Sequence, residues 1–423
     1  MILEFRVRNF RSFLKEAVFS LVASKDHDLA ETNTVSTAIR GIPRAVRTAV
    51  IYGANASGKS NLILAILYMR SMISESAKLQ PSQNFNAQPF RLNEESVKAP
   101  TLLEMTVLIN GIRYQYGFEF TAERIVSEWL LVYKSTKPQK WIDRYIDANG
   151  NEVIDPGANL AGQKNLWKEA TRHNSLFLST AVQLNSEQLR PLSNWFQESL
   201  VIFLAGGHIA FDFSTASLQD KTSHDAITSL LSAADIGIES IAAVQQKSFF
   251  QTIQINALTG KSDASGGERE MLLPRFRHAA GNVRADFEYA DESEGTQKLF
   301  SLASPILDIL KRGRVLVIDE LDRSFHPLLV RKIVEVFQDP QVNENGAQLI
   351  FTTHDTSLLD SNLLRRDQIW LTEKQSDQSS ELLPLTTFSP RKGEALAKAY
   401  LSGRYGAVPI LRETLVPPKP RRG

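Results

Sequence analysis

One glycine-rich segment, Gly53–Ser60, constrains the fold of this 423-residue chain more than any other feature. It reads Gly-Ala-Asn-Ala-Ser-Gly-Lys-Ser, and it lies between apolar runs at residues 49–52 and 62–67 that are typical of a strand and a helix. Glycines at both ends let the backbone wrap so that its N–H groups face phosphate oxygens, and the positive end of the following helix adds to the attraction. This order of strand, loop and helix predicts a site for a nucleoside triphosphate.

The side chains of this loop have separate expected roles. Lys59 is expected to reach the β- and γ-phosphates of ATP, and Ser60 is expected to ligate Mg²⁺. The other predicted nucleotide contacts come from the same segment and the residue after it: Gly53, Asn55, Ser57, Gly58 and Asn61. A chance match to the pattern is the alternative, and the flanking strand and helix disfavour it.

Two further apolar runs end in polar residues that suit nucleotide hydrolysis. Residues 314–318 are followed by Asp319 and Glu320, and residues 348–351 are followed closely by His354. Open α/β sheets bind ligands at the carboxyl ends of parallel strands. We therefore expect Asp319 to hold Mg²⁺ through water, Glu320 to act as base toward the attacking water, and His354 to hydrogen-bond the γ-phosphate. The alternatives are a helix start for the two acids and an ordinary loop residue for the histidine.

Two glycine-containing turns compete for the element that, in ATPases of the ABC and SMC type, completes the site from the opposite protomer. Ser265–Glu268 is more like the transporter version, whereas Ser293, Gly295 and Thr296 lead directly into a helical run. The signature helix should run straight into the strand that bears Asp319. Ser293 precedes Asp319 by 26 residues (319 − 293), and the other turn precedes it by 54 (319 − 265). We therefore predict the Ser293 turn as the γ-phosphate contact and the other turn as a flexible loop.

The order of elements predicts an α/β fold, and the Gly53–Ser60 loop together with the Ser293 turn resembles a P-loop NTPase head of the ABC/SMC kind. It should have a mixed sheet with helices, an antiparallel β-subdomain and a helical insertion. Hairpins are expected at Asn110-Gly111 and Asn149-Gly150, and helical periodicity from about 160 to 255. The predicted division is an N-terminal lobe with the phosphate loop and hairpins at 1–125, a β-hairpin and helical insertion at 126–257, a C-terminal lobe with the signature, Asp319-Glu320 and His354 at 258–415, and a disordered tail at 416–423.

Composition excludes several classes of protein. The 48 basic and 47 acidic residues leave a net charge of +1, so bulk charge gives no support for a nucleic-acid partner, although a local patch is still open. The chain has no cysteine, which excludes disulfides, thiol catalysis and cysteine-ligated metals. The N-terminus lacks the apolar core of a secretion signal, and no run approaches the roughly 18 apolar residues of a membrane span. We expect a soluble cytoplasmic protein with no membrane partner.

Several segments together resemble the RloA/AbiL-type prokaryotic ATPases, an ABC/SMC-like group linked to abortive infection and restriction loci. The segments that carry the resemblance are Phe5–Phe13, Gly53–Ser60, Glu292–Gln297, Ile318–Pro327, Thr352–Asp355 and Tyr400–Pro409. The resemblance implies that Arg11 and Ser12 lie near the nucleotide base, and that Asp322–Pro327 forms the loop through which two heads communicate. Phe325 replaces the leucine that is usual in this group. Gln88 is the candidate for the metal-sensing glutamine, and an ordinary loop residue is the alternative.

One phosphate loop and one signature turn are expected on opposite faces of a head, so one copy cannot close its own site. We therefore expect an ATPase, converting ATP and water to ADP and phosphate, that works as a dimer or larger homo-oligomer and closes on binding ATP. The resemblance implies an anti-phage role and a separate effector, an RloB-like nuclease. The 69 residues after His354 (423 − 354) are expected to be too few for an added nuclease domain.

Two other functions remain open from the sequence. A DNA-handling head of the recombination and repair kind would need a basic groove, and Arg365-Arg366, Arg391-Lys392 and the basic tail are insufficient for one. A transporter nucleotide-binding subunit would normally carry a Leu-Ser-Gly-Gly-Gln signature, and the long insertion between 100 and 255 argues against it. Salt-dependent DNA binding would favour the first, and copurification with membrane subunits the second.

Overall fold

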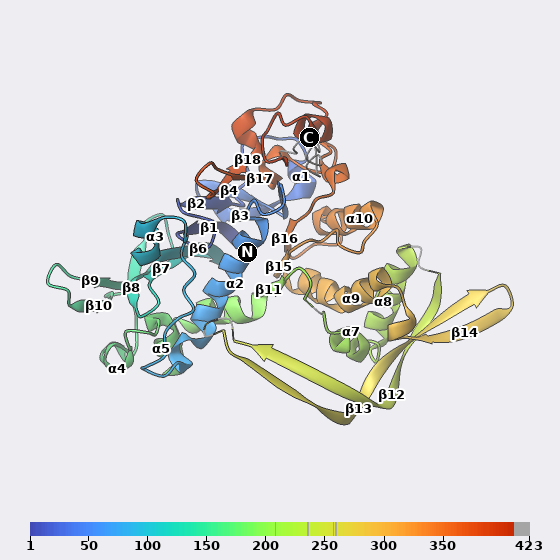
Figure 1. Ribbon diagram of the computed structural model, residues 1–423, viewed down its shortest axis with the longest axis horizontal. Coiled ribbons are helices and arrows are strands. Elements are labelled where there is room, and N and C mark those ends of the chain that lie inside the picture. Colours follow the sequence, from blue (N-terminus) through green and yellow to red (C-terminus); the bar gives the residue numbers. More distant parts are fainter. Residues whose placement is uncertain (208, 235–236, 257, 259, 410–423) are drawn as a thin grey trace, which may run out of the picture.

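A largely parallel sheet lies at the centre of the molecule, in a computed structural model that describes residues 1–207, 209–234, 237–256, 258 and 260–409 (Figure 1). Within those residues the sheet has the strand order β11-β15-β16-β5-β17-β18, parallel except for the last strand. Buried apolar residues fill β5, β15 and β16, as is typical of a sheet covered on both faces. The strands are β5 (Thr48–Gly53), β11 (Leu200–Phe203), β15 (Val315–Ile318), β16 (Gln348–Thr352), β17 (Ile369–Lys374) and β18 (Ser380–Pro384).

Two apolar clusters pack on the two faces of this sheet. Along β15, Val315 and Val317 join the cluster that contains α2, whereas Leu316 and Ile318 join the cluster that contains α9 and α10. This division follows from the alternation of side chains along a strand. The helices are α1 (Ala30–Asn33), α2 (Lys59–Glu75), α3 (Glu94–Lys98), α4 (Lys164–Ala170), α5 (Phe177–Gln183), α6 (Arg190–Asn194), α7 (Asp212–Ser217), α8 (Lys221–Ala233), α9 (Glu294–Arg312), α10 (Pro327–Gln338) and α11 (Leu396–Leu401), with short turns of 3₁₀ or π type at η1 (Ser76–Lys78), η2 (Trp195–Ser199), η3 (Tyr289–Asp291), η4 (Thr356–Leu358), η5 (Arg366–Gln368) and η6 (Leu385–Phe388).

An antiparallel sheet forms the lobe on the left of Figure 1, with the order β10-β9-β8-β7-β6-β1-β2. The predicted hairpins are confirmed, because β6 and β7 turn at Asn110-Gly111 and β9 and β10 turn around Asn149-Gly150. A smaller pair, β3 with β4, follows α1. The strands are β1 (Ile2–Arg8), β2 (Ala17–Ser20), β3 (Thr34–Ile39), β4 (Ile42–Val46), β6 (Thr101–Ile109), β7 (Ile112–Phe120), β8 (Ile125–Tyr133), β9 (Gln139–Ile146) and β10 (Glu152–Pro156).

A buried carboxylate fastens the helical segment α4–α6 to this lobe. Glu128 on β8 accepts hydrogen bonds from the backbone N–H groups of Phe177 and Leu178, at 2.7 and 2.9 Å, and from the Tyr116 hydroxyl at 2.9 Å. The Arg144 guanidinium lies 3.5 Å from the same carboxylate, and both side chains are fully buried. Glu128 therefore satisfies the first N–H groups of α5 and holds that helix against the sheet.

A long two-stranded ribbon contradicts two predictions. Residues 238–255 do not continue the helical pattern of α4–α8 but form β12 (Ile238–Ile255), which pairs with β13 (Ser262–Ala280) and then β14 (Val283–Glu288). The predicted flexible loop at 265–268 is likewise wrong, because these residues pair with β12 inside the ribbon. Most described positions in its middle are exposed on both faces, so the sequence lacks the apolar alternation that marks a half-buried strand.

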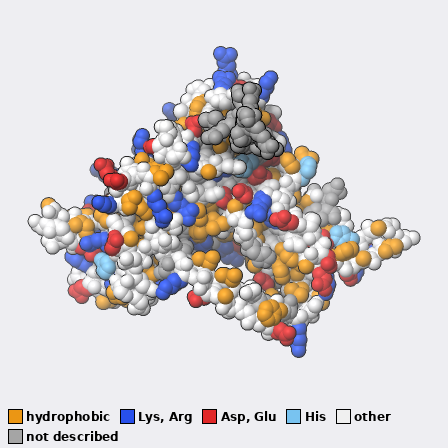
Figure 2. Space-filling model, viewed as in Figure 1, with side chains coloured by type: hydrophobic (Ala, Val, Ile, Leu, Met, Phe, Trp, Pro, Cys, Tyr) orange, Lys and Arg blue, Asp and Glu red, His pale blue; other side chains and the backbone are white. Residues whose placement is uncertain are grey.

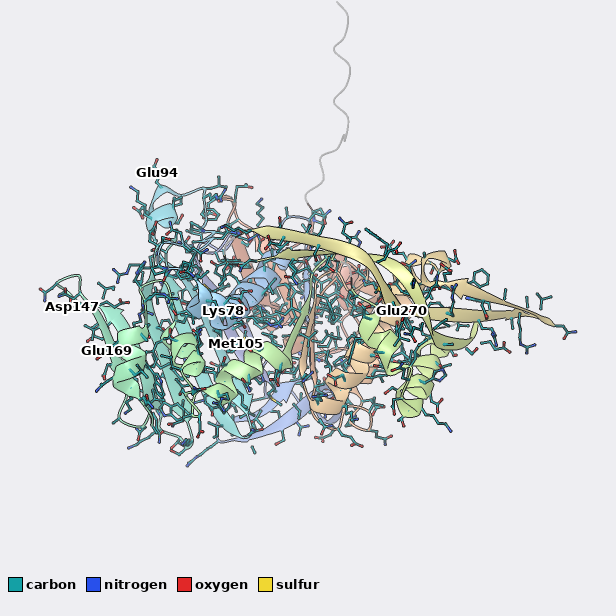
Figure 3. All side chains as sticks on the ribbon, turned by 90° about the horizontal axis from the view of Figure 1, so that it is seen from below. Lys78, Glu94, Met105, Asp147, Glu169 and Glu270 are labelled. Atoms are coloured by element: carbon teal, nitrogen blue, oxygen red, sulfur yellow. The ribbon has the colours of Figure 1, made fainter. Side chains whose placement is uncertain are left out.

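The ribbon joins the two sides of the molecule. Figures 1 and 3 show β12 and β13 crossing from the side of α7 and α8 to the antiparallel lobe. At the far end Leu258 is fully buried among residues of that lobe, and its carbonyl accepts the N–H of Asn86 at 2.6 Å. The predicted tail at 416–423 lies outside the described residues. Of the helices described, none is both long enough and apolar enough for a membrane crossing.

Candidate functional site

The loop Gly53–Ser60 connects β5 to α2, as the sequence predicts. Gly58 has a φ of 116°, and a Cβ at this position would lie 2.4 Å from Ser380 Oγ, so a larger residue would be both strained and in collision. Lys59 starts the helix and is 7% exposed. Its amine donates to the carbonyls of Gly53 and Ala54 at 2.8 and 3.0 Å. The lysine is thus folded back over its own loop.

A single hydroxyl organises the two acids that follow β15. Thr352 Oγ1 donates to Asp319 Oδ1 at 2.6 Å and accepts the backbone N–H of Glu320 at 2.7 Å. Asp319 is 6% exposed, whereas the Glu320 side chain is 37% exposed. Glu320 has a φ of 54°, a left-handed conformation that is unfavourable for a residue with a Cβ. The threonine therefore fixes one carboxylate inward and helps to hold the strained backbone that presents the other to solvent.

His354 follows β16, the strand between β15 and β5, and completes the group at this sheet edge. Its N–H on the backbone donates to Asp322 Oδ2 at 3.2 Å. Partial desolvation and the nearby Lys59 lower the pKa of the imidazole, against the opposing effect of Asp322, Glu320 and Asp319. Burial likewise lowers the pKa of Lys59, and the same three carboxylates oppose it. The structure thus brings the predicted lysine, acids and histidine within one another's electrostatic reach.

The oxygen donors present here suit a small divalent cation. Asp319 Oδ1 is already bonded to Thr352, which orients the carboxylate and leaves its other oxygen without a protein donor in the described structure. Ser60 is the second residue of α2 and follows Lys59. A hydroxyl and a carboxylate are hard oxygen ligands, and Mg²⁺ commonly takes one or two such groups together with water and phosphate oxygens. The predicted metal ligands are therefore chemically compatible with Mg²⁺.

The predicted signature turn begins a helix, as expected. Ser293 is the N-cap of α9: its hydroxyl accepts the N–H of Thr296 at 3.2 Å, and it is exposed while Thr296 is buried. Across the described residues, no hydrogen bond or ion pair joins this turn to Gly53–Ser60. Instead, a Cβ on Gly295 would lie 2.7 Å from the backbone oxygen of Ser324, in the loop after the two acids. The turn packs on that loop and not on the phosphate loop of its own chain.

Arg11 and Ser12 lie beside the phosphate loop, at a cavity of about 430 Å³ that also receives Asn61 and Gln88. Asn61 donates to Ser12 Oγ at 2.7 Å, and the Ser12 and Ser380 hydroxyl oxygens are hydrogen-bonded to each other at 2.7 Å. The Arg11 guanidinium is 3.5 Å from the side-chain Oδ1 of Asn61. The two residues that the resemblance associates with the base therefore share a cavity with the helix that follows the phosphate loop. The Gln88 carbonyl accepts the Arg11 N–H at 2.6 Å, which ties Gln88 to this cavity.

Sequence reasoning missed four polar residues that support the site. Thr352 and Lys298 contact the acids and their loop, Thr372 bonds the Ser57 hydroxyl at 2.6 Å, and Ser380 bonds both Ser12 and the Ser57 carbonyl. Thr352 is the one with a sequence signal, because it is a polar residue at the end of an apolar strand. The partners of the others are distant in sequence.

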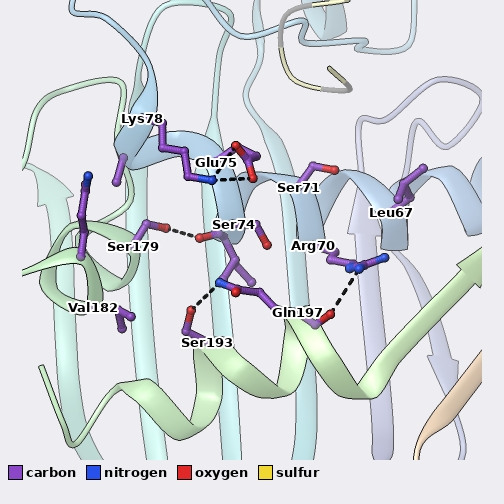
Figure 4. A pocket seen from close by; sticks show the side chains of 13 residues that line it. Leu67, Arg70, Ser71, Ser74, Glu75, Lys78, Ser179, Val182, Ser193 and Gln197 are labelled. Atoms are coloured by element: carbon purple, nitrogen blue, oxygen red, sulfur yellow. Dashed lines mark hydrogen bonds and ion pairs between the residues drawn. The ribbon is translucent and has the colours of Figure 1, made fainter. Parts of the chain in front are cut away.

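A second cavity, of about 530 Å³, lies away from these residues, at the C-terminal end of α2 (Figure 4). It is lined by α2, α5 and α6, with Arg70 donating to the Gln197 carbonyl at 3.2 Å. Its lining on α2 begins at Leu67, eight residues after Lys59, which is roughly 12 Å along the helix at 1.5 Å per residue. None of its lining residues belongs to the group at the sheet edge.

Comparisons with known proteins cover most of the chain. A family model described as "AAA domain, putative AbiEii toxin, Type IV TA system" matches residues 49–360, which is 312 of 423 residues and spans β5 to the region after His354. No curated protein sequence matches the chain. Among solved structures, an SMC head bound to the C-terminal winged-helix domain of ScpA is similar with a TM-score of 0.43 and 14% identity, covering 90% of this chain and 96% of that one.

Proposed function

The chain belongs to the AAA-domain family that is described with the AbiEii toxin of type IV toxin–antitoxin systems, and from this premise we propose that it binds ATP and hydrolyses it to ADP and phosphate. The observation that supports the proposal best is the meeting of Lys59, Asp319, Glu320 and His354 at the carboxyl ends of three neighbouring parallel strands. That edge is where open α/β sheets bind nucleotides.

In the proposed reaction each side chain has one task. Lys59, which now bonds its own loop, turns to the β- and γ-phosphates, and the N–H groups at the start of α2 bind the same oxygens. Ser60 and Asp319 would hold Mg²⁺, which when bound neutralises phosphate charge. Glu320, partly exposed, takes a proton from the water that attacks the γ-phosphorus. His354, whose pKa is lowered in the protein without nucleotide, hydrogen-bonds the γ-phosphate as the bond to ADP breaks.

We propose that two copies of the chain form each complete site. Ser293 is exposed and lies at a helix N-terminus, where N–H groups and the helix dipole favour an anion. In its own chain this turn contacts the Ser324 carbonyl and, through Glu292, His278 on β13 at 2.7 Å. Ser293 itself is exposed beside these contacts, which leaves room for a phosphate held by a partner. In this proposal Ser293, Gly295 and Thr296 of each copy face Lys59 of the other.

Arg11 and Ser12 are proposed to bind the base of ATP, because the cavity that they line adjoins Asn61 at the start of α2. A planar guanidinium can stack on a base, and the serine hydroxyls can hydrogen-bond its edge. Gln88 lines the same cavity, which supports a role near the base more than one at Mg²⁺.

The proposed biological role is that of a cytoplasmic ATP-driven switch in phage defence. Two points support it: the resemblance to RloA/AbiL-type ATPases, and the family description, which names a toxin of a toxin–antitoxin system. The switch would control a separate effector, proposed to be an RloB-like nuclease. On the face drawn in Figure 2, basic and acidic side chains are interspersed, which does not favour a DNA-handling head.

Purified protein tests the proposal directly. Wild-type protein should release phosphate from Mg²⁺-ATP, and Glu320→Gln should keep ATP affinity, lose most turnover and accumulate as a dimer in light scattering. Lys59→Ala should lose ATP binding in calorimetry. Well-folded wild-type protein with no affinity for Mg²⁺-ATP would refute the function, and a strictly monomeric Glu320→Gln protein in ATP would refute the two-copy site.

A further inference from the structure

Lys298 on α9 reaches back from the first turns of the helix to the loop that follows β15. Its amine donates to the backbone carbonyl of Arg323 at 2.6 Å, to that of Leu321 at 3.2 Å and to that of Glu320 at 3.4 Å. It also lies 4.6 Å from the centre of the Phe325 ring, a cation–π contact. An ammonium has three donors, so all of them are committed to this one loop.

The character of these partners distinguishes the contact from a surface ion pair. In the described structure, the hydrogen-bond acceptors of the Lys298 amine are all main-chain carbonyls, so the amine fixes the path of the backbone. The loop needs fixing, because Glu320 and Ser324 both have left-handed conformations, with φ of 54° and 67°. The side chain is only partly exposed, so holding the ammonium against these carbonyls carries a desolvation cost.

A second contact joins the same two elements. The position that a Cβ on Gly295 would take is 2.7 Å from the Ser324 carbonyl, so the helix start and the loop touch backbone to backbone. Lys298 lies five residues after Ser293, the N-cap of α9. A shift of the Ser293 turn along the helix axis therefore moves Lys298 with it, since a helix of 19 residues behaves as a rod over this distance.

We propose that Lys298 is a positioning residue that couples the two nucleotide sites of the dimer, by linking the turn that contacts the partner's ATP to the loop that carries Glu320 at its own ATP. This inference rests on the proposed function. When the Ser293 turn contacts the γ-phosphate held by the partner, α9 shifts and Lys298 moves the backbone carbonyl of Glu320. The Glu320 carboxylate, the proposed base, changes position with it. Hydrolysis at one site then depends on occupancy of the other.

Lys298→Met tests the proposal, because methionine keeps the length and apolar stem but has no donor. We expect ATP affinity and ATP-driven dimerisation to change by less than about twofold. Turnover should fall by about tenfold or more, since a small misplacement of a catalytic group is costly, and the Hill coefficient for ATP should fall to about 1. Lys298→Arg, which keeps a cation with donors, should restore part of both. Lys311→Met, an exposed position at the other end of α9, is the matched control.

The outcomes distinguish a failure of the proposed function from a failure of the coupling role of Lys298. Wild-type protein without ATP hydrolysis or dimerisation would refute the proposed function itself. Active, cooperative wild-type protein together with an equally active and cooperative Lys298→Met variant would overturn the coupling role alone. If the methionine variant lacks a cooperative thermal transition, Lys298→Leu, which also has no donor, carries the same test. Parallel loss of stability and ATP affinity, with cooperativity retained, would assign Lys298 a structural role and overturn the proposal.

Discussion

The hydroxyl of Thr352 donates to Asp319 Oδ1 at 2.6 Å, and this bond connects the ends of two adjacent strands, β16 and β15. The same oxygen accepts the N–H of Glu320 at 2.7 Å. One fully buried side chain thus orients the proposed metal ligand and supports the strained residue that carries the proposed base. Support of this kind from outside the ligand set is commonly as important to metal affinity as a ligand.

Thr352→Val should weaken Mg²⁺ binding while preserving the volume of the side chain. It frees the Asp319 carboxylate to rotate and leaves the Glu320 N–H without its acceptor. We expect the Mg²⁺ concentration for half-maximal ATP turnover to rise, and turnover to fall, by about 10- to 100-fold. Phosphate release measured across a magnesium titration checks this. Thr352→Ser keeps the hydroxyl and should stay near wild type; an unchanged titration for the valine variant would contradict the role.

Glu128→Ala should destabilise the antiparallel lobe and its helices. The substitution removes the acceptor of two N–H groups at the start of α5, while Arg144 keeps its ion pair with Glu152 at 2.5 Å. Leaving a buried donor unsatisfied costs about 1–3 kcal/mol, and urea unfolding should show a loss of that order. Glu169→Ala, on an exposed position of α4, is the control. An equal midpoint for both variants would show that the buried network contributes little.

Local sequence patterns were sufficient to predict most of the elements at the sheet edge that carries Lys59, Asp319 and His354. The glycine-containing turn that leads into a helical run located the start of α9 at Ser293. The apolar runs before Asp319 and His354 became neighbouring strands, as predicted. In each case residues near in sequence determine the element, so the sequence pattern alone predicts it.

The missed features depend on contacts that no local pattern encodes. The ribbon β12–β13 is held by pairing between strands and by Leu258 at its far end, while its middle is exposed. Lys298 could be read only as a charged residue on a helix surface, because its acceptors belong to a loop more than 20 residues away. The left-handed backbone at Glu320 is likewise set by Thr352 on another strand.

Turnover should decline as the pH rises through about 8, because burial lowers the pKa of Lys298 to about 8. Asp322, Glu294 and Glu320 oppose this shift, and Arg323 adds to it. The neutral amine loses one donor and its charge, so the loop carrying the base loosens. A pH–rate profile at saturating ATP would show an alkaline limb near 8. Lys298→Arg should remove it, because a guanidinium keeps its proton there.

Unfolding measured over the same pH range is the control for that profile. Since the folded pKa of Lys298 is below the unfolded value of 10.5, the unfolded chain binds more protons between about pH 8 and 10.5, and the contribution of this group to stability increases with pH. Reduced turnover near pH 9 without a loss of stability attributable to this lysine would agree with the prediction. An alkaline limb that persists unchanged in the arginine variant would assign it to another group.

Mixing two inactive variants should restore activity, because each complete site is proposed to contain Lys59 of one copy and Ser293 of the other. In a mixed dimer of Lys59→Ala with Ser293→Arg chains, one site has both defects and the other has neither. Half of randomly formed dimers are mixed and each has one intact site, so phosphate release should recover to at most about a quarter of wild type. The proposed coupling through Lys298 lowers it further, because the defective site of a mixed dimer stays empty. Either variant alone should stay inactive. Differently tagged chains show whether mixed dimers form. If they form without recovery of activity, either each chain closes its own site or both sites must be intact. Activity from the Ser293→Arg protein alone would exclude the turn from the site.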